Sequence, residues 1–264
     1  MKRIVFCDVD GTLLNSSHQM TLRTQEAIQK LKQRDTGFVI VSARSPSGIY
    51  PILKENDFQC PIIAYSGALL LDENRQVLFH KGMKKNVAKQ IIQFAEEEQL
   101  DMSWCAYSLD EWIVRDKADE RIRKEEQIVK AEARKGTIDT IVDAEINKIL
   151  CICNPAALLS IEHQLREKFP FLSIAKSSDY LLEIMEKGIT KAGAIKKVCR
   201  LWNIPLQNTV AFGDNYNDVE MLETVGTGFL MDNAPEELKK RFYRHTKDND
   251  HDGIYYGLRE LGWI

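Results

Sequence analysis

The first apolar run of the chain, and the acidic residues that end it, constrain the fold most. Residues 4–7 are Ile-Val-Phe-Cys, and Asp8-Val9-Asp10-Gly11-Thr12 follows directly. A short apolar run that stops at a turn is typical of a strand buried on both faces. Asp8 and Asp10 project to one side of an extended segment, and neighbouring carboxylates favour a cation or a shared proton. We therefore expect chemistry at this strand end, although Asp-Gly is also common in ordinary turns.

Strand and helix patterns alternate on both sides of a different middle block. Before it, apolar runs predict strands at 38–41 and 61–65, a hairpin at 69–71 and 77–80, and helices over 21–34 and up to residue 54. After it, they predict helices over 191–201 and from 219, strands at 209–212 and 228–231, and a helical end over 235–264 with a polar interruption at 247–253. Such alternation implies a parallel sheet with right-handed crossovers, in which ligands bind at the carboxyl ends of the strands.

The middle block has the strand pairs of an α+β unit. Helices are expected over 86–98 and 155–168, strands at 102–107, 112–115, 146–153, 172–175 and 180–185, and a solvated charged helix over 116–135. We therefore expect residues 83–186 to form a domain inserted into a core made of residues 1–82 and 187–264. Trp104, Tyr107, Trp112 and Arg115 either line a ligand face of this domain or pack within it.

The composition is that of a soluble globular protein. The chain has 264 residues, 36 basic and 39 acidic side chains and a net charge of −3. This balance gives no reason to expect nucleic acid or a membrane as partner, and no stretch reads as a membrane span or a signal peptide. The six cysteines lie mostly in apolar runs and are expected to be reduced core residues of a cytoplasmic protein, Cys151-x-Cys153 included.

Polar residues recur at the ends of four predicted elements. They are the pair Asp8 and Asp10, Ser42 after the second strand, Lys191 at a helix start, and the cluster Asp214, Asn217 and Asp218. This order, with Asp-Val-Asp-Gly-Thr-Leu-Leu at 8–14 and Gly-Asp-Asn-Tyr-Asn-Asp-Val-Glu-Met-Leu at 213–222, resembles the haloacid dehalogenase (HAD) superfamily across the whole chain. The place of the insert resembles the type 2 α+β cap of its Cof-type (subfamily IIB) sugar phosphatases, which implies an α/β fold with a Rossmann-like parallel-sheet core.

The resemblance assigns a role to each of these positions. It makes Asp8 the nucleophile and Asp10 the general acid and base. It implies a Mg²⁺ ion held by the side chains of Asp8 and Asp214 and the backbone carbonyl of Asp10, in keeping with the oxygen ligands that Mg²⁺ prefers. The implied phosphate-binding residues are Val9, Ser42, Ala43, Lys191 and Asn217, and the implied supporting residues are Thr12, Arg44 and Asp218.

Two short segments depart from the family pattern. Ser42-Ala43-Arg44 stands where the family commonly has Thr-Gly-Arg. Serine keeps the hydroxyl, but alanine narrows the backbone freedom that glycine allows. Ser66-Gly67 stands where many relatives have Asn-Gly, so a contact on the substrate side is expected to differ.

The expected function is a Mg²⁺-dependent phosphatase for small phosphorylated metabolites, most of all sugar phosphates, acting as a monomer or small homo-oligomer. Phosphoryl transfer needs a placed nucleophile, charge neutralisation and in-line geometry, which the residues above would supply. A phosphohexomutase is the nearest alternative, because enzymes with a similar cap and core run that reaction. A non-catalytic phosphate-binding module is a further one, but it predicts a damaged acid pair, whereas Asp8 and Asp10 are both intact.

Overall fold

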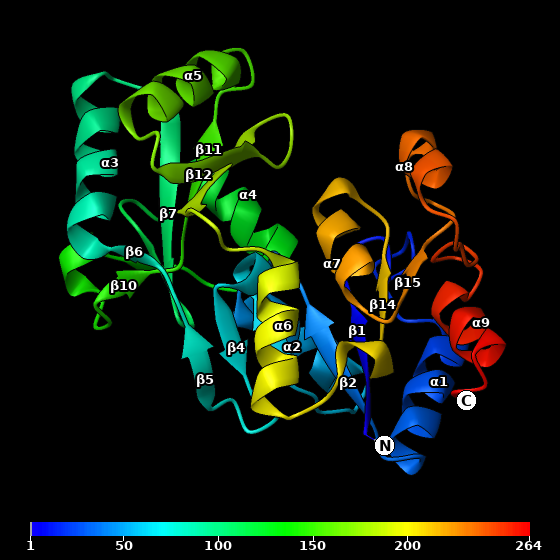
Figure 1. The fold of residues 1–264 in the computed structure, drawn as a ribbon. Helices are drawn as coiled ribbons and strands as arrows, with labels where there is room; N and C mark the ends of the chain where they lie inside the picture. The colour runs from blue at the N-terminus through cyan, green and yellow to red at the C-terminus, as the bar shows by residue number, and fades with distance from the viewer. Residues whose placement is uncertain (1) are drawn as a thin grey trace. The chain divides into compact units, whose positions relative to one another are not determined.

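The computed structural model describes residues 2–264, which divide into two compact units. The first unit comprises the described residues up to Ala43 together with Ile52–Leu78 and Thr190–Ile264, and the second comprises Arg44–Pro51 and Phe79–Ile189. Figure 1 shows the elements of both units by label and by colour along the chain.

The first unit is built on a seven-stranded sheet in the order β15-β14-β1-β2-β3-β4-β5. The strands are β1 (Arg3–Cys7), β2 (Thr36–Val41), β3 (Ile62–Ala64), β4 (Leu69–Leu71), β5 (Val77–His80), β14 (Thr209–Gly213) and β15 (Thr227–Leu230). Strands β15 to β3 pair in parallel, and β4 returns antiparallel to β3. The apolar run that begins the chain is thus the middle one of the five parallel strands, buried from Ile4 onward because helices cover both faces of a parallel sheet.

Helices cover this sheet on both sides. They are α1 (Leu22–Gln33), α6 (Lys191–Leu201), α7 (Val219–Thr224), α8 (Glu236–Arg241) and α9 (Gly253–Glu260), while α2 (Pro46–Glu55) runs from the second unit into the first. Figure 1 shows α6 beside α7 on one side of the sheet and α1 beside α9 on the other, and both pairs are in contact. The hydroxyls of Thr21 and Thr190 cap α1 and α6, each accepting a hydrogen bond from a backbone N–H of the first turn. Short 3₁₀ turns occur at η1 (Tyr65–Gly67), η3 (Leu206–Asn208) and η4 (Tyr216–Asp218).

The second unit is an α+β unit with a mainly antiparallel sheet. Its order is β12-β13-β11-β7-β8-β9, made of β7 (Met102–Ser108), β8 (Glu111–Val114), β9 (Arg134–Lys135), β11 (Lys148–Cys153), β12 (Leu172–Lys176) and β13 (Leu181–Glu186). Alternate residues of these strands pack with α3 (Lys85–Glu97) and α5 (Leu158–Lys168) in one apolar core, as the period of two along a strand requires. The remaining elements are α4 (Glu120–Val129), η2 (Ile138–Thr140) and the small pair β6 (Met83–Lys84) and β10 (Glu145–Ile146).

Three of the expected elements are wrong in extent. The C-terminal segment is helical only as α8 and α9, so its interruption spans 242–252 and not 247–253. The charged segment is helical only as α4, because Lys130 adopts a left-handed conformation with φ of 54° and ends the helix. The strand expected at 146–153 is interrupted at Asn147, which is fully buried. Its side chain accepts a hydrogen bond from the N–H of Leu109 and donates one to the carbonyl of Lys81. Because these hydrogen bonds hold the buried amide, the strand is divided at Asn147. The apolar pattern of the sequence alone predicts one continuous strand.

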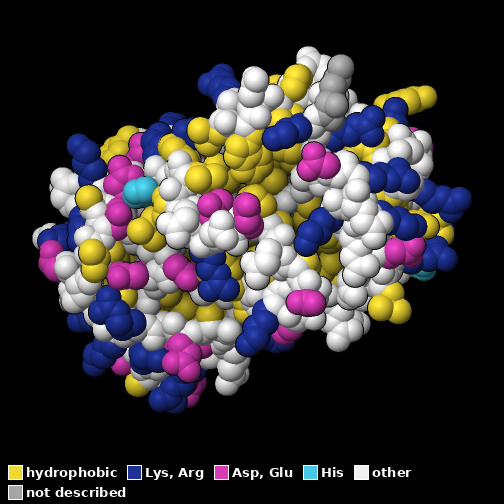
Figure 2. All heavy atoms as spheres, turned by 90° about the horizontal axis from the view of Figure 1, so that it is seen from below, with side chains coloured by type: hydrophobic (Ala, Val, Ile, Leu, Met, Phe, Trp, Pro, Cys, Tyr) yellow, Lys and Arg dark blue, Asp and Glu magenta, His cyan; other side chains and the backbone are white. Residues whose placement is uncertain are grey.

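Three aromatic residues that the sequence singles out in the second unit pack within it. Trp104, Tyr107 and Trp112 are all buried, and the rings of Tyr107 and Trp112 stack with centroids 5.5 Å apart, whereas Arg115 is exposed. All six cysteines are buried free thiols. Within residues 2–264, no helix has the length and apolar character needed to span a bilayer. On the face shown in Figure 2, Lys and Arg side chains are interspersed with Asp and Glu.

Candidate active site

The turn after β1 fixes Asp8 at the carboxyl end of that strand. The N–H of Asp8 donates to the carbonyl of Phe212 on β14 at 3.1 Å, and its carbonyl accepts from Leu13 N–H at 3.1 Å. Gly11 has φ of +79°, a conformation that favours glycine, and a Cβ there would stand 2.4 Å from Oδ2 of Asp214. The glycine therefore lets the turn close directly against a second carboxylate from a neighbouring strand end.

Lys191 joins two buried carboxylates. Its Nζ donates to Oδ1 of Asp8 and to Oδ1 of Asp218, at 2.6 Å in each case, and the lysine is only 2% exposed. Burial disfavours the ammonium, but the attraction of Asp8 and Asp218 outweighs it and raises the pKa of Lys191 above its usual range. Lys191 is the first residue of α6, where the helix dipole is unfavourable to a cation, so the two carboxylates are what hold its charge there.

Asp8 and Asp214 are carboxylates short of compensating charge. Burial raises the pKa of Asp8 to about 8, with a further rise from Asp218 and an opposing effect of Lys191. Burial also raises the pKa of Asp214 to about 6, although the Thr12 hydroxyl donates to its Oδ1 at 2.7 Å and lowers it. Three carboxylates surround one ammonium, and this imbalance favours an additional cation.

Both oxygens of Asp218 are occupied by protein donors. Oδ1 accepts from Lys191, and Oδ2 accepts from the backbone N–H groups of Asp214 at 3.1 Å and Asn215 at 3.0 Å. A Cβ at Gly213 would lie 2.5 Å from Cβ of Asp218, so glycine permits this close approach. Asp218 therefore fixes the loop after β14 and orients Lys191.

Three of the residues expected to bind phosphate, Val9, Ser42 and Ala43, follow the neighbouring strands β1 and β2. Val9 is buried in the turn after β1, and its N–H has no acceptor among residues 2–264. Ser42 follows β2, is 1% exposed, donates through its N–H to the carbonyl of Ile63 and accepts from the N–H of Ser66, both at 2.8 Å. Ala43 is next to it and half-buried.

The remaining expected site residues are Asp10, Asn217 and Arg44. Asp10 and Asn217 are exposed, and Asn217 has no side-chain hydrogen-bond partner in the described chain. Arg44 donates to the carbonyl of Gly48 at 3.2 Å, within the second unit. The structure thus brings together five of the predicted residues through their side chains, namely Asp8, Thr12, Lys191, Asp214 and Asp218.

Two features that support this site were not predicted. Asn233, beyond the end of β15, donates to the carbonyl of Gly11 at 2.8 Å and accepts from Asn249 N–H at 3.2 Å, so it braces the turn after β1. The second is the strained turn η1, in which Tyr65, Ser66 and Gly67 have φ of 49°, 52° and 116°. Asn233 had one signal in the sequence, a polar residue just past a strand of the same parallel sheet.

The carboxylate cluster fits a divalent cation. One oxygen each of Asp8, Asp214 and Asp218 lie within 4.8 Å of one another. Hard cations such as Mg²⁺ take carboxylate and carbonyl oxygens, and the excess of negative charge here matches that preference. Because Asp218 already accepts three hydrogen bonds, Asp8 and Asp214 are the side chains best placed to hold the ion.

Comparison with known proteins decides the family. The family model described as haloacid dehalogenase-like hydrolase matches residues 5–258. The chain belongs to this family. A Haemophilus influenzae protein named "Putative phosphatase" is 34% identical over 261 residues, which cover 98% of each chain. A haloacid dehalogenase-like hydrolase from Bacteroides thetaiotaomicron has the same fold, with a TM-score of 0.89, 24% identity and coverage of 99% of this chain and 100% of the other.

The subclass IIB sugar phosphatase BT4131 also shares the fold. Its TM-score is 0.82 at 20% identity, and the match covers 99% of this HAD chain and 100% of that protein. The predictions of a HAD superfamily hydrolase, and of an α/β fold with a Rossmann-like core and an inserted α+β unit, are therefore confirmed. Members of the family generally use a divalent metal ion, and the aspartate cluster provides a place for one.

Proposed function

We propose that this HAD hydrolase is a Mg²⁺-dependent phosphatase that hydrolyses small phosphorylated metabolites, sugar phosphates above all, through an aspartyl-phosphate on Asp8. The observation that carries the proposal is the way Asp8 is held. Lys191 occupies its Oδ1, while its Oδ2 accepts no hydrogen bond from residues 2–264. A buried carboxylate fixed at one oxygen presents the other to a phosphorus atom with little freedom left to lose.

In the first step, Oδ2 of Asp8 forms a bond to phosphorus as the bond from phosphorus to the leaving oxygen breaks. Asp10, exposed two residues on, gives its proton to that oxygen, so the leaving group departs as an alcohol. The ammonium of Lys191 and the N–H of Val9 stabilise the charge on the phosphoryl oxygens, as Ser42 does from the next strand end. A Mg²⁺ ion held by Asp8, Asp214 and the Asp10 carbonyl would neutralise part of the charge on the phosphoryl group.

In the second step, Asp10 takes a proton from a water molecule whose oxygen attacks phosphorus. The bond between phosphorus and Oδ2 breaks, which releases phosphate and restores the Asp8 carboxylate. The second acid is what favours hydrolysis over storage of the phosphoryl group, because without it the aspartyl-phosphate lacks a base to activate water.

The choice of sugar phosphates draws on the relatives and on the inserted unit. The Haemophilus influenzae relative and BT4131 carry phosphatase names, and BT4131 is named as a sugar phosphatase. We propose that residues 83–186 act as the cap that selects the leaving group, while residues 1–82 and 187–264 carry the chemistry. Remote binding contacts of this kind commonly set specificity in enzymes that close over a substrate.

The test is phosphate release from a panel of hexose and pentose phosphates, with Mg²⁺ and with EDTA, by the parent protein, Asp8→Asn and Asp10→Asn. We expect Mg²⁺-dependent release that Asp8→Asn abolishes and Asp10→Asn lowers by at least about 10²-fold, the usual contribution of general acid–base catalysis. Release that persists in Asp8→Asn would refute the nucleophile. Absence of release, with isomerisation of a hexose phosphate after addition of a hexose bisphosphate, would identify a mutase instead.

A further inference from the structure

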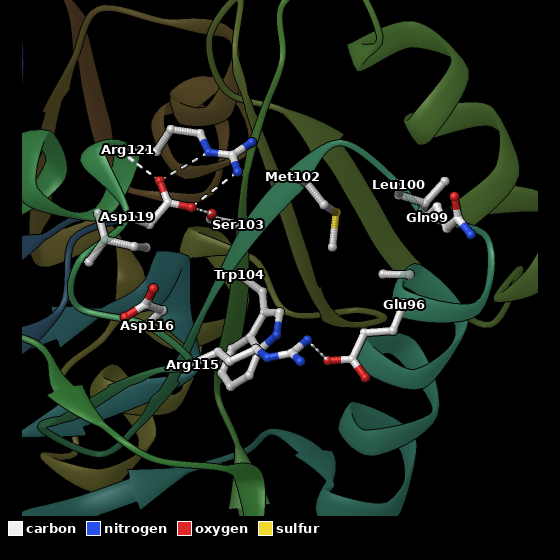
Figure 3. A pocket seen from close by; sticks show the side chains of 12 residues that line it. Glu96, Gln99, Leu100, Met102, Ser103, Trp104, Arg115, Asp116, Asp119 and Arg121 are labelled. Carbon is white, nitrogen blue, oxygen red and sulfur yellow. Dashed lines mark hydrogen bonds and ion pairs between the residues drawn. The ribbon is translucent and has the colours of Figure 1, made fainter.

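The second unit contains a pocket that the phosphatase site does not use. Its volume is about 500 Å³, within the range of small-molecule sites. Residues at the end of α3, the start of β7, the segment after β8 and the start of α4 line it, and Figure 3 shows their side chains. All of these residues belong to the second unit, so the pocket shares no residue with the Asp8 cluster.

Trp104 supplies a hydrogen-bond donor without a partner. Its side chain lines the pocket and is only 8% exposed, and its Nε1–H has no acceptor anywhere in residues 2–264. Buried polar groups are nearly always hydrogen-bonded, and an indole N–H can only donate. A ligand atom that accepted a hydrogen bond from this nitrogen would offset the desolvation free energy that the unpaired N–H costs the protein.

An exposed ion pair lies beside this donor. Nη1 of Arg115 contacts Oε1 of Glu96 across the pocket, next to the indole of Trp104 (Figure 3). The two charged side chains are 68% and 48% exposed, and Arg115 makes no other side-chain hydrogen bond within the described chain. Pairs this exposed contribute little to stability, so a ligand can separate them at low cost.

The far wall of the pocket is already satisfied. Asp119 accepts from the Ser103 hydroxyl and, through both oxygens, from the backbone and guanidinium of Arg121. Arg121 also donates to Asp101 at 3.0 Å. These groups form a fixed wall. The other polar side chains of the lining are those of Trp104, Arg115, Glu96, Gln99 and Asp116, whose Oδ1 accepts from the N–H of Ala118.

We propose that this pocket binds a small aliphatic α-amino acid. Its carboxylate accepts from Nε1 of Trp104 and from Arg115, its ammonium donates to Glu96, and its side chain lies against Met102 and Leu100. A zwitterion gives each member of the opened ion pair a new partner of opposite charge and adds no net charge to the site. A simple carboxylate would leave Glu96 without its cation, and a simple amine would leave the indole N–H without an acceptor.

The first test is isothermal titration of the whole protein with L-alanine, L-valine, L-leucine and L-methionine. Two probes each lack one charge of leucine, namely 4-methylpentanoate and 3-methylbutylamine. We expect saturable binding of at least one amino acid, and binding at least about tenfold weaker for both single-charge probes, the loss that follows when one charged hydrogen bond is missing. No heat of binding from any of the four amino acids at millimolar concentration overturns the proposal, as does equal binding of either single-charge probe.

The second test uses a matched pair of tryptophan variants. Trp104→Phe keeps an aromatic ring and removes the N–H. Trp112→Phe makes the same change at a second buried indole, whose Nε1 also lacks a partner. Trp112 does not line the pocket and therefore serves as the control. We expect Trp104→Phe to weaken binding about tenfold or more and Trp112→Phe to leave it unchanged. Arg115→Gln is expected to weaken binding as well. Because the Arg115 side chain is exposed, this substitution leaves the apolar core intact and the protein should fold. Unchanged affinity in both Trp104→Phe and Arg115→Gln would refute the site.

Discussion

Gly67 lies directly against the backbone of Thr190, the residue that caps α6 immediately before Lys191. A Cβ at Gly67 would stand 2.5 Å from the Thr190 carbonyl oxygen and 3.2 Å from Cβ of Ala194. Gly67 also has φ of +116°, and Ser66 beside it donates to the carbonyl of Ser42. One strained turn therefore positions both the helix start that carries Lys191 and the end of the strand that carries Ser42.

The first prediction follows from that contact. Gly67→Ala forces the start of α6 to move, which disturbs the 2.6 Å contact between Lys191 and Asp8. We expect kcat for the best sugar phosphate to fall at least about tenfold and the free energy of unfolding to fall by about 1–3 kcal/mol, as for other strained backbone positions. Steady-state kinetics and urea denaturation measure the two effects.

Gly262→Ala is the matched control for backbone strain. Gly262 has φ of +66°, but a Cβ there meets nothing within 4 Å. It should lose about 1 kcal/mol of stability and keep the parent kcat. If both variants lost stability and neither lost kcat, η1 would have no positioning role.

A second prediction separates the roles of Asp214 and Asp218. Asp214→Asn removes a charged ligand of the proposed Mg²⁺ site, so the Mg²⁺ concentration for half-maximal activity should rise at least about tenfold. Asp218→Asn instead disturbs Lys191 and the loop after β14, because both Asp218 oxygens accept hydrogen bonds there. It should lower kcat with little change in the Mg²⁺ requirement, and Mg²⁺ titrations of both variants measure the difference. The reverse pattern would make Asp218 the metal ligand.

A third prediction concerns the stability of the metal-free protein against pH. The pKa of Asp214 is raised by burial from 3.8 to about 6, so the folded state binds more protons than the unfolded state between these values. The contribution of Asp214 to the free energy of unfolding is therefore greatest below pH 4. It falls as the pH rises through 6, by at most about 3 kcal/mol. Asp214→Asn should remove this loss, and so be more stable than the parent protein at pH 8 in EDTA and equal to it near pH 4. Urea denaturation at both pH values measures the free energy of unfolding of the two proteins. An equal fall in stability from pH 4 to pH 8 in the parent protein and in Asp214→Asn would contradict the assignment.

The sequence was sufficient to predict that Asp8, Lys191 and Asp214 come together, because these residues lie where strands and helices end. Asp8, Lys191 and Asp214 each follow or begin a strongly patterned element, and a parallel sheet gathers its carboxyl ends along one edge. The contacts that support the site could not be predicted from the sequence. Gly67 meets Thr190 through a contact between residues 123 positions apart, and only the folded backbone shows that the glycine is needed there.

The pocket of the second unit shows the same limit from another side. Periodicity places Trp104 on a strand and leaves open whether its ring lines a ligand face or packs within the unit. It cannot show that Nε1 lacks an acceptor, because that depends on every segment packed around the ring. The interruption at Asn147 was missed for a similar reason, since its partners Lys81 and Leu109 lie far from it in the chain.

The last prediction concerns Thr12, whose hydroxyl donates to Oδ1 of Asp214 at 2.7 Å. In the parent protein this hydrogen bond lowers the pKa of Asp214. Thr12→Val keeps the shape of the side chain, which is only 2% exposed, and removes the hydrogen bond. Without it, the pKa of Asp214 rises further, and protons compete more strongly with Mg²⁺ for the carboxylate. The Mg²⁺ requirement should therefore increase more at pH 6 than at pH 8, where the carboxyl has lost its proton in both proteins. Activity titrated with Mg²⁺ at the two pH values measures this, with Thr36→Val as control, because Thr36 is another buried threonine whose hydroxyl makes only a 3.5 Å contact to the Arg34 carbonyl. An equal change at both pH values would mean that Thr12 orients Asp214 without setting its pKa.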